Sequence, residues 1–256
     1  MTPTHVFVAR MTTDELDAIA SGPRPLAILV PVGAIEPHGP HLALDTDLII
    51  SRAAAERAAA ILSQRGAVAL VAPDIPYGVT RFAGGFSGAV NVPEAALVSY
   101  LRGVVEGWLA AGAAHVCLVN NHLEPAHDAS VRDSIAGLPA ARASVASPLT
   151  RRWARTLSDE FKRGACHAGE YETSIVQAAD AASVREGIRR SLADVDISLS
   201  DGIASGLETF RAMGMSQSYS GAPARATPSH GDEMLSRLSE MIVGEVSDAM
   251  GLTPTS

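Results

Sequence analysis

Two short segments of the chain each place a carboxylate and an imidazole two residues apart, directly after an apolar run. The first is Glu36-Pro37-His38, which follows the run 26–33, and the second is His122-Leu123-Glu124, which follows the run 115–120. In extended backbone, residues i and i+2 point to the same side, so each segment can offer one nitrogen and one oxygen ligand to a common space. Two such segments, together with an aspartate, have the ligands that a pair of divalent metal ions needs.

Two metal ions that share a site need a ligand that bridges them, and an aspartate carboxylate has two oxygens for this role. Asp45 and Asp47 both follow His38, around the start of a helix expected over 46–64. Composition alone does not choose between them, and Asp45 also suits the N-terminal end of that helix without any metal. A water between two bridged ions would lose a proton near neutral pH and could attack a substrate carbonyl as hydroxide.

A C–N bond breaks more easily when the leaving nitrogen receives a proton, and histidine is the side chain best suited to carry one. His167 is the candidate, and Gly169 beside it would let a substrate approach. Cys166 precedes it, and a thiolate–imidazole pair can be nucleophilic, but the metal ligands favour a pocket-lining or packing role for Cys166. Two other histidines are expected outside the ligand set: His41 as a hydrogen-bonding neighbour, and His127 facing solvent or neighbouring side chains.

The elements that must position these residues alternate along the chain. Apolar runs that predict buried parallel strands occupy 26–32, 67–72 and 115–120. Segments that predict helices occupy 16–20 (after a capping-box pattern, Thr12-x-x-Glu15), 46–64, 93–111, 126–136 and 230–250. This alternation predicts one α/β domain over 1–256, with a parallel sheet covered by helices on both faces. Ligands of such sheets lie beyond the carboxyl ends of the strands, where both Glu/His segments fall.

The overall composition limits the function classes. With 20 Lys and Arg against 28 Asp and Glu, the net charge is −8, and no basic cluster offers a nucleic-acid surface. No apolar run reaches membrane-spanning length and residues 1–20 lack a signal pattern, so we expect no membrane partner and a cytoplasmic location. Two cysteines, Cys117 and Cys166, do not make a disulfide framework.

Four motifs occur in order along the chain and are similar to those of one known family. They are 33–42 (GAIEPHGPHL) with 45–47 (DTD), 76–78 (PYG), 120–124 (NNHLE), and 167–169 (HAG) with 172–174 (ETS). The first motif is long and specific, and the last two are specific in combination. The chain therefore resembles the creatininase (creatinine amidohydrolase) family over nearly its whole length.

The resemblance implies a three-layer α/β/α sandwich with a mainly parallel central sheet. It implies two divalent metal ions per chain, with zinc expected before manganese, in a hydrolase that cleaves C–N bonds of cyclic or linear amides. It also implies a small-molecule amide substrate and a homo-oligomer, since some members form hexamers.

The metal ligands are carried over from the family residue by residue. The ligands of one ion would be Glu36, Asp47 and His122, and those of the other ion would be His38, Asp47 and Glu124. The bridge is then Asp47 in preference to Asp45.

The catalytic residues implied by the resemblance are His167, Glu124 and Glu172. His167 matches the proton-transfer histidine, and Glu172 matches a carboxylate that the family keeps beside the site. Trp153 falls in the region where creatininase has a mobile aromatic loop, which makes a substrate contact a further expectation. The Gly/Ser-rich segment 198–220 predicts a long functional loop.

Positions that face substrate depart from the family pattern. Ala83 and 86–89 (FSGA) replace the histidine and the Phe-Pro-Gly-Thr of many members, and Cys166 replaces an acidic residue of creatininase. These departures predict a substrate other than creatinine.

The leading hypothesis is a dinuclear amidohydrolase that cleaves a C–N bond in a small cyclic amide, lactam or related amide by a metal-bridging hydroxide. One alternative is a peptidase or deformylase of the same family, which an open, long groove would favour. The other is a non-catalytic member that only binds metal, and the complete ligand set argues against it.

Overall fold

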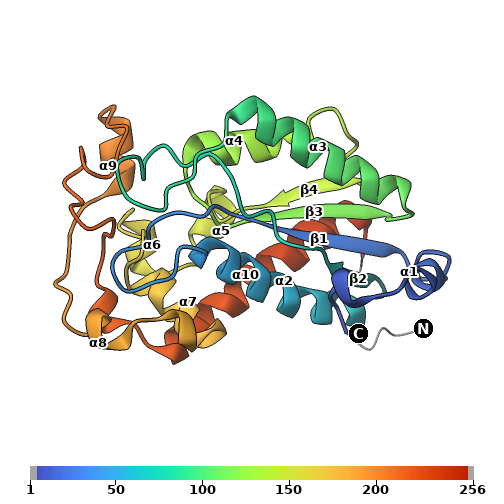
Figure 1. Ribbon diagram of the computed structural model, residues 1–256. Helices are drawn as coiled ribbons and strands as arrows, with labels where there is room; N and C mark the ends of the chain where they lie inside the picture. Colours follow the sequence, from blue (N-terminus) through green and yellow to red (C-terminus); the bar gives the residue numbers. More distant parts are fainter. Residues whose placement is uncertain (1–4, 253–256) are drawn as a thin grey trace.

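Four parallel strands form the central layer of the structure, a computed structural model that describes residues 5–252 (Figure 1). The strands are β1 (Leu26–Val32), β2 (Val68–Val71), β3 (His115–Asn120) and β4 (Ala143–Ala146), in the spatial order β2-β1-β3-β4. The three predicted strands are confirmed. The sequence did not predict β4, because its small residues (ASVA) make no strong apolar run. The first four and last four residues of the predicted domain lie outside the described range.

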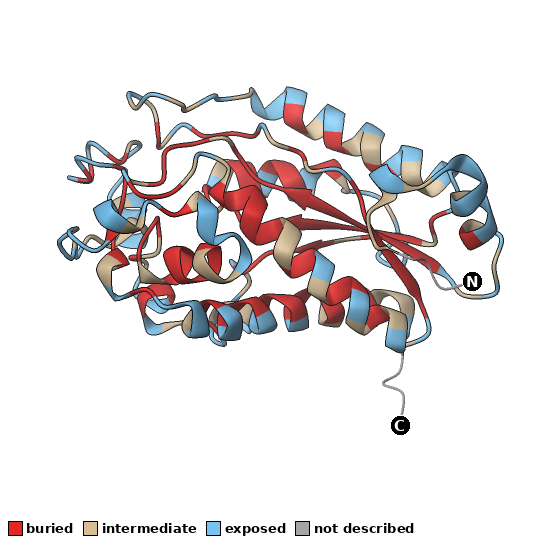
Figure 2. Ribbon diagram, turned by 60° about the horizontal axis from the view of Figure 1, so that its bottom comes forward, coloured by how far each residue is buried: buried red, intermediate tan, exposed pale blue. Residues whose placement is uncertain are grey.

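Helices cover both faces of this sheet. On one side are α2 (Thr46–Gln64), α7 (Glu170–Ala179) and α10 (Pro228–Met250), and on the other are α1 (Thr13–Ala20), α3 (Glu94–Ala110) and α4 (Pro125–Ser134). The strands are buried between the helices, whose exposed sides face outward (Figure 2). The predicted three-layer α/β/α sandwich is therefore confirmed, and the ends of the predicted helices are correct to within three residues.

Short helices and irregular segments follow β4. They include α5 (Arg151–Ala154), α6 (Asp159–Lys162), α8 (Glu186–Arg189) and α9 (Leu199–Ala204), and 3-10 turns cover Val8–Arg10, Ala181–Ser183 and Pro223–Arg225. The predicted loop 198–220 thus contains one helix, α9, because the Ser198 hydroxyl caps it by accepting the N–H of Asp201. Within the described chain, no helix is long and apolar enough to cross a lipid bilayer.

Alternate residues of the strands pack into opposite layers. In β1, Ala27 and Leu29 join the core under α2 and α10, whereas Leu26, Ile28 and Val30 join the core under α1 and α3. All seven residues of β1 are buried, as expected for a parallel strand covered on both sides. Each face of the sheet therefore has an apolar core of its own.

The connections that leave β1 and β3 create a crevice at their carboxyl ends. β1 leads through α2, on one face, to β2, and β3 leads through α4, on the opposite face, to β4. The chain leaves these neighbouring strands in opposite directions, and ligands of open parallel sheets bind at such a point. The segments 33–45 and 121–124, which carry the two Glu/His pairs, begin there.

The helix α10 crosses α7 with almost no space between the two backbones. At Gly231, an added Cβ would lie 1.8 Å from the carbonyl oxygen of Ser174 in α7. The N–H of Thr227 also donates to the Ser174 hydroxyl at 3.1 Å. Because α7 carries Glu172 in its first turn, this contact helps to position a predicted site residue.

We expect Gly231→Ala to lower the free energy of unfolding by about 3 kcal/mol, because the new methyl group would force the two helices apart. Gly107→Ala is the matched control: Gly107 lies in the exposed part of α3, where a Cβ meets nothing within 4 Å. That variant should gain about 0.5–1 kcal/mol from helix propensity. Urea denaturation of both variants measures the difference, and equal effects would contradict the proposed backbone contact.

Candidate metal centre

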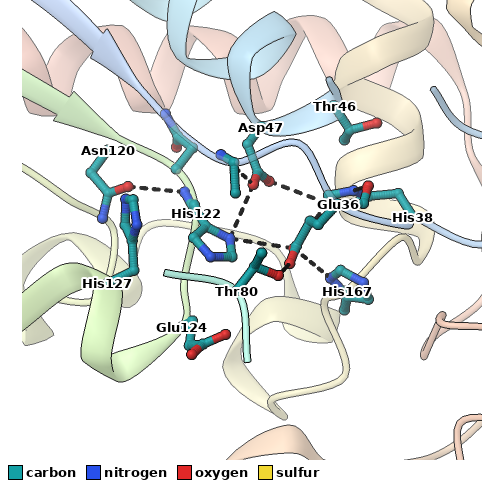
Figure 3. A network of polar contacts seen from close by, with 12 residues as sticks. Glu36, His38, Thr46, Asp47, Thr80, Asn120, His122, Glu124, His127 and His167 are labelled. Atoms are coloured by element: carbon teal, nitrogen blue, oxygen red, sulfur yellow. Dashed lines mark hydrogen bonds and ion pairs between the residues drawn. The ribbon is translucent and has the colours of Figure 1, made fainter. Parts of the chain in front are cut away.

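Side chains from four parts of the chain meet beyond the carboxyl ends of β1 and β3. Figure 3 shows those of Glu36, His38, Asp47 and His122. Glu36 and His38 follow β1, His122 follows β3, and Asp47 lies in the first turn of α2. Glu172 comes from α7. All of these side chains are buried, with at most 3% of their surface exposed.

One group of possible ligands consists of Glu36, Asp47 and His122. Nδ1 of His122 lies 3.0 Å from Oδ2 of Asp47 and 3.3 Å from Oε1 of Glu36. Gly33 makes room for the aspartate, because a Cβ at this position would lie 2.7 Å from the Cβ of Asp47.

A second group consists of His38, Asp47 and Glu172. Nε2 of His38 lies 3.2 Å from Oδ1 of Asp47 and 3.7 Å from Oε2 of Glu172. Asp47 therefore turns one carboxylate oxygen toward each histidine, the arrangement that a bridging ligand requires. Asp45 is the N-terminal flanking residue of α2 and belongs to neither group.

Glu124 is the predicted ligand that the structure does not bring into either group. Its carboxylate Oε2 instead accepts the backbone N–H of Phe82 at 3.1 Å, although the side chain lines the same cleft as His122. The i, i+2 geometry expected of the second Glu/His segment is thus not realised. Oε2 of Glu124 is thus engaged by Phe82, whereas Glu172, whose Oε2 accepts the N–H of Ala168 at 2.7 Å, is the carboxylate that joins the second group.

Backbone carbonyl groups orient the two imidazoles of the cluster. Nδ1 of His38 donates to the Glu36 carbonyl at 3.1 Å, and Nε2 of His122 donates to the Val79 carbonyl at 2.7 Å. Because a carbonyl oxygen can only accept, these nitrogens carry protons. Nε2 of His38 and Nδ1 of His122 are therefore the nitrogens that face the carboxylates, as in metal sites whose histidines are oriented by outer hydrogen bonds.

His167 lies beside this cluster, with its ring centroid 4.5 Å from that of His38. Its Nε2 donates to the Pro37 carbonyl at 3.0 Å, and its Nδ1 lies 3.8 Å from Oε1 of Glu36. Burial and the neighbouring charge of His38 lower the pKa of His167 to about 4. The ring is therefore neutral near pH 7, with the lone pair on Nδ1 directed at the cluster.

A buried carboxylate that the sequence analysis missed holds the His167 segment. Glu160 accepts the N–H of Tyr171 at 2.9 Å and the N–H of Ala222 at 2.8 Å. A Cβ at Gly169 or Gly221 would lie 2.3 Å from one of its oxygens, so both positions exclude a side chain. Glu160 belongs to no motif, and the sequence offers no signal for this long-range role.

Hydrogen bonds hold two further residues against the cluster. Thr80, which the sequence analysis also missed, donates to Oε2 of Glu36 and lies just beyond the Pro-Tyr-Gly motif. His127 is buried, its ring centroid 4.6 Å from that of His122, and its Nδ1 accepts the N–H of Val79 at 3.2 Å. The solvent-facing alternative for His127 is therefore wrong, because its ring packs against the ring of His122.

The remaining expected site residues lie around or outside the cluster. Nε2 of His41 is hydrogen-bonded to the Thr173 hydroxyl at 2.9 Å, as expected for a neighbour rather than a ligand. Cys166 lines the cleft, and burial raises the pKa of its thiol well above the usual value, so it is not a thiolate near pH 7. Trp153 donates to Glu245 of α10 at 2.6 Å and does not line the cleft.

The charges of the cluster suit divalent cations. Burial alone would lower the pKa of His38, but Asp47 and its neighbouring carboxylates raise it to about 10. The pKa of Asp47 is held low by His38 and His122 despite burial. In the metal-free chain, protonated imidazoles thus balance the carboxylates. Nε2 of His38 makes no hydrogen bond within the described residues. Nitrogen and oxygen donors without thiolate suit zinc or manganese, and the cluster fits such ions.

The model of the family described as creatininase (creatinine amidohydrolase) matches residues 9–246. The chain belongs to the creatininase family.

Sequence relatives of this family member match over limited lengths. The "mycofactocin precursor peptide peptidase" of Mycolicibacterium smegmatis is 47% identical over 74 residues, 27% of this chain and 29% of the relative. The "creatinine amidohydrolase" of Pseudomonas putida is 30% identical over 125 residues, 46% of this chain and 45% of the relative. The matched part is thus less than half of each relative's length.

Solved structures of the family share the fold over almost the whole chain. A "creatinine amidohydrolase (creatininase)" superposes with a TM-score of 0.75 at 19% identity, covering 98% of this chain and 100% of that one. A "putative creatinine amidohydrolase" from Bacteroides fragilis gives 0.76 at 20% identity, with both chains covered completely. Other solved creatininases are described as a manganese form and a Zn-Zn type.

We expect zinc binding at pH 7 to release protons, about three per chain, because His38 and His122 are protonated in the metal-free protein and burial raises the pKa of Glu172 to about 8, so that this carboxyl also holds a proton. A group whose pKa is raised holds its proton until the pH exceeds that pKa, so the release should shrink as the pH rises through about 8 for Glu172 and through about 10 for His38. Apparent zinc affinity should therefore increase with pH between about pH 6 and 9. Titration calorimetry in buffers with different ionisation enthalpies measures the release, and a heat independent of the buffer would contradict it.

Proposed function

We propose that this creatininase-family protein is a dinuclear metal-dependent amidohydrolase. The observation that carries the proposal is that Asp47 belongs to two of the three buried groups of possible ligands, with one carboxylate oxygen toward the histidine of each. The third group is Glu36, His38 and His167. Bound divalent ions lower the pKa of water and polarise an amide carbonyl, which is the chemistry that hydrolysis of a C–N bond needs. The family description, creatinine amidohydrolase, supports the same reaction class.

The two ions would be held by different histidines. One ion would take Glu36, Asp47 and His122, and the other would take His38, Asp47 and Glu172. Glu124, which the family resemblance favours as a ligand, would first have to leave the N–H of Phe82. We propose zinc before manganese, since the donors are imidazole and carboxylate.

His167 would move the proton in this reaction. Its Nε2 is engaged by the Pro37 carbonyl, so Nδ1 is the atom free to take a proton and pass it to the leaving nitrogen. Thr80 binds one oxygen of Glu36 and leaves the other facing His122. These hydrogen bonds fix the reacting groups before substrate arrives, which lowers the cost of reaching the transition state.

The first candidate substrate remains a small cyclic amide, lactam or related amide. A peptide is the second candidate, and one observation favours it. The cleft over the cluster continues past Pro125 and Ile203 into a second hollow, lined by Arg81 and by residues 206–209. A groove of that extent suits a chain longer than a single ring, and the partial similarity to a peptide peptidase supports this reading.

We further propose that the protein acts in the cytoplasm as a homo-oligomer, for which the family resemblance suggests a hexamer.

The metal content of purified protein tests the dinuclear site. We expect about two zinc or manganese ions per wild-type chain and a loss of most of both in Asp47→Ala, because one carboxylate serves both groups. Asp45→Ala is the control, since Asp45 lies two residues away and belongs to neither group. Plasma mass spectrometry gives the content, and full occupancy in Asp47→Ala would refute the bridging role.

Two further variants decide the ligand of the second ion. Glu172→Gln should lose about one ion per chain, whereas Glu124→Gln should keep both, because the Glu124 carboxylate is bound to Phe82. The reverse result would mean that Glu124 turns into the cluster when metal is present.

Loaded wild-type protein is then assayed on cyclic amides, lactams, formyl amides and peptides. Two ions per chain with no turnover of any of these would favour the non-catalytic alternative.

A further inference from the structure

The cleft above the ligand cluster has an apolar side. The uncharged side chains that line it are Phe82, Leu123, Pro125, Leu199, Ile203 and Phe210. Among the described residues, no lysine or arginine lines this cleft, and its ionisable groups are carboxylates, imidazoles and the Cys166 thiol. An anionic group on a substrate would therefore meet no compensating side chain there, whereas an apolar group would leave water for an apolar surface.

A row of neighbouring rings joins the cluster to this apolar side. The ring of Phe210 lies 4.3 Å from that of His167 and 6.1 Å from that of Phe82. Phe210 and Phe82, here called the aromatic wall, thus extend the ring pair of His38 and His167 toward the mouth of the cleft. A group attached next to a bond that is cleaved at the cluster would lie within reach of these rings.

The aromatic wall is held in place independently of any ligand. The N–H of Phe210 donates to the Phe82 carbonyl at 2.8 Å, and the N–H of Phe82 donates to Glu124 at 3.1 Å. Phe210 is buried in a small apolar cluster with Ala83 and Met215, separate from the two cores of the sheet. Phe82 is only partly buried, so it has surface left to cover a ligand. A preformed apolar surface costs little ordering entropy when a ligand binds.

The wall is built from segments that lie far apart in the sequence. Phe82 follows the Pro-Tyr-Gly motif, whereas Phe210 belongs to the segment after α9, at the end of the molecule beyond the carboxyl ends of the strands (Figure 1). The metal ligands come instead from strand ends and helix starts. Substrate choice can therefore be altered at the wall without altering the ligand cluster.

We propose that the aromatic wall selects substrates with an uncharged apolar group, aromatic in the best case, next to the amide bond that is cleaved. Phe82 and Phe210 are the specificity-determining residues. This inference rests on the proposed metal-dependent function, since it places the bond at the ligand cluster. It applies equally to a lactam with an apolar substituent and to a peptide with an apolar residue at the cleavage site.

Binding of hydroxamates to the zinc-loaded protein tests the proposal without any turnover. Hydroxamates chelate zinc, so acetohydroxamate reports on the cluster and phenylacetohydroxamate adds an aromatic ring. We expect the phenyl compound to bind about tenfold tighter or more in titration calorimetry. A derivative with a carboxylate on the ring should lose that advantage, because no lysine or arginine lines the cleft and Arg81 of the adjoining hollow is paired with Glu94.

Two variants assign the effect to the wall. Phe82→Ala should reduce the advantage of the phenyl compound to about twofold while acetohydroxamate binds as before. Phe86→Ala is the control: the family pattern puts Phe86 among the positions expected to face substrate, but in the structure it packs against the same apolar cluster and under the Arg211 guanidinium and does not line the cleft. It should leave both affinities unchanged.

The possible failures are distinguishable. Equal binding of the acetyl and phenyl compounds to fully loaded wild-type protein would overturn the role of the wall and leave the metal site intact. An advantage for the phenyl compound that survives in Phe82→Ala would also overturn it. Absence of zinc and of all hydroxamate binding would overturn the proposed function itself, and the inference with it.

Discussion

The rest of the structure depends on the attraction between buried carboxylates and the cations that balance them. Glu36, Asp47 and Glu172 share one space from which water is largely excluded, and like charges cannot be buried together without compensation. In the metal-free chain, protonated His38 and His122 provide it for Glu36 and Asp47, which is why the pKa values of both histidines are raised despite burial, whereas burial raises the pKa of Glu172 to about 8 and keeps that carboxyl neutral near pH 7. Divalent ions would provide it more completely, with the same atoms as ligands.

The fold separates the groups that bind charge from those that choose substrate. The ligands follow β1 and β3 or begin α2 and α7, so hydrogen-bonded elements fix their positions. The apolar side of the cleft comes from segments around α9 and after the Pro-Tyr-Gly motif, with a small core of its own. This division explains how a chain can keep the family's ligand set and still depart from its pattern at Ala83 and 86–89.

The sequence by itself determined the frame of the site. Apolar runs and their alternation with helical segments were sufficient for the strands β1 and β3, because a parallel strand buried on both faces needs a continuous run of large apolar residues. The position of Glu36, His38 and His122 beyond those strands then followed, since parallel neighbours end at the same edge of a sheet. The motifs also favoured Asp47 over Asp45 as the bridging ligand, a choice that composition alone could not make.

The contacts of the other side chains of the site were decided only by the tertiary structure. Glu172 lies in the second group and Glu124 does not, while Glu124 accepts the Phe82 N–H, 42 residues away from it in the chain. Glu160 and Phe210 likewise act through partners distant in sequence, so no local spacing reveals them. Motif and periodicity report where an element begins and which side it buries. A hydrogen bond or ring contact across the fold depends on the packing of whole elements, and that packing is not written in any single segment.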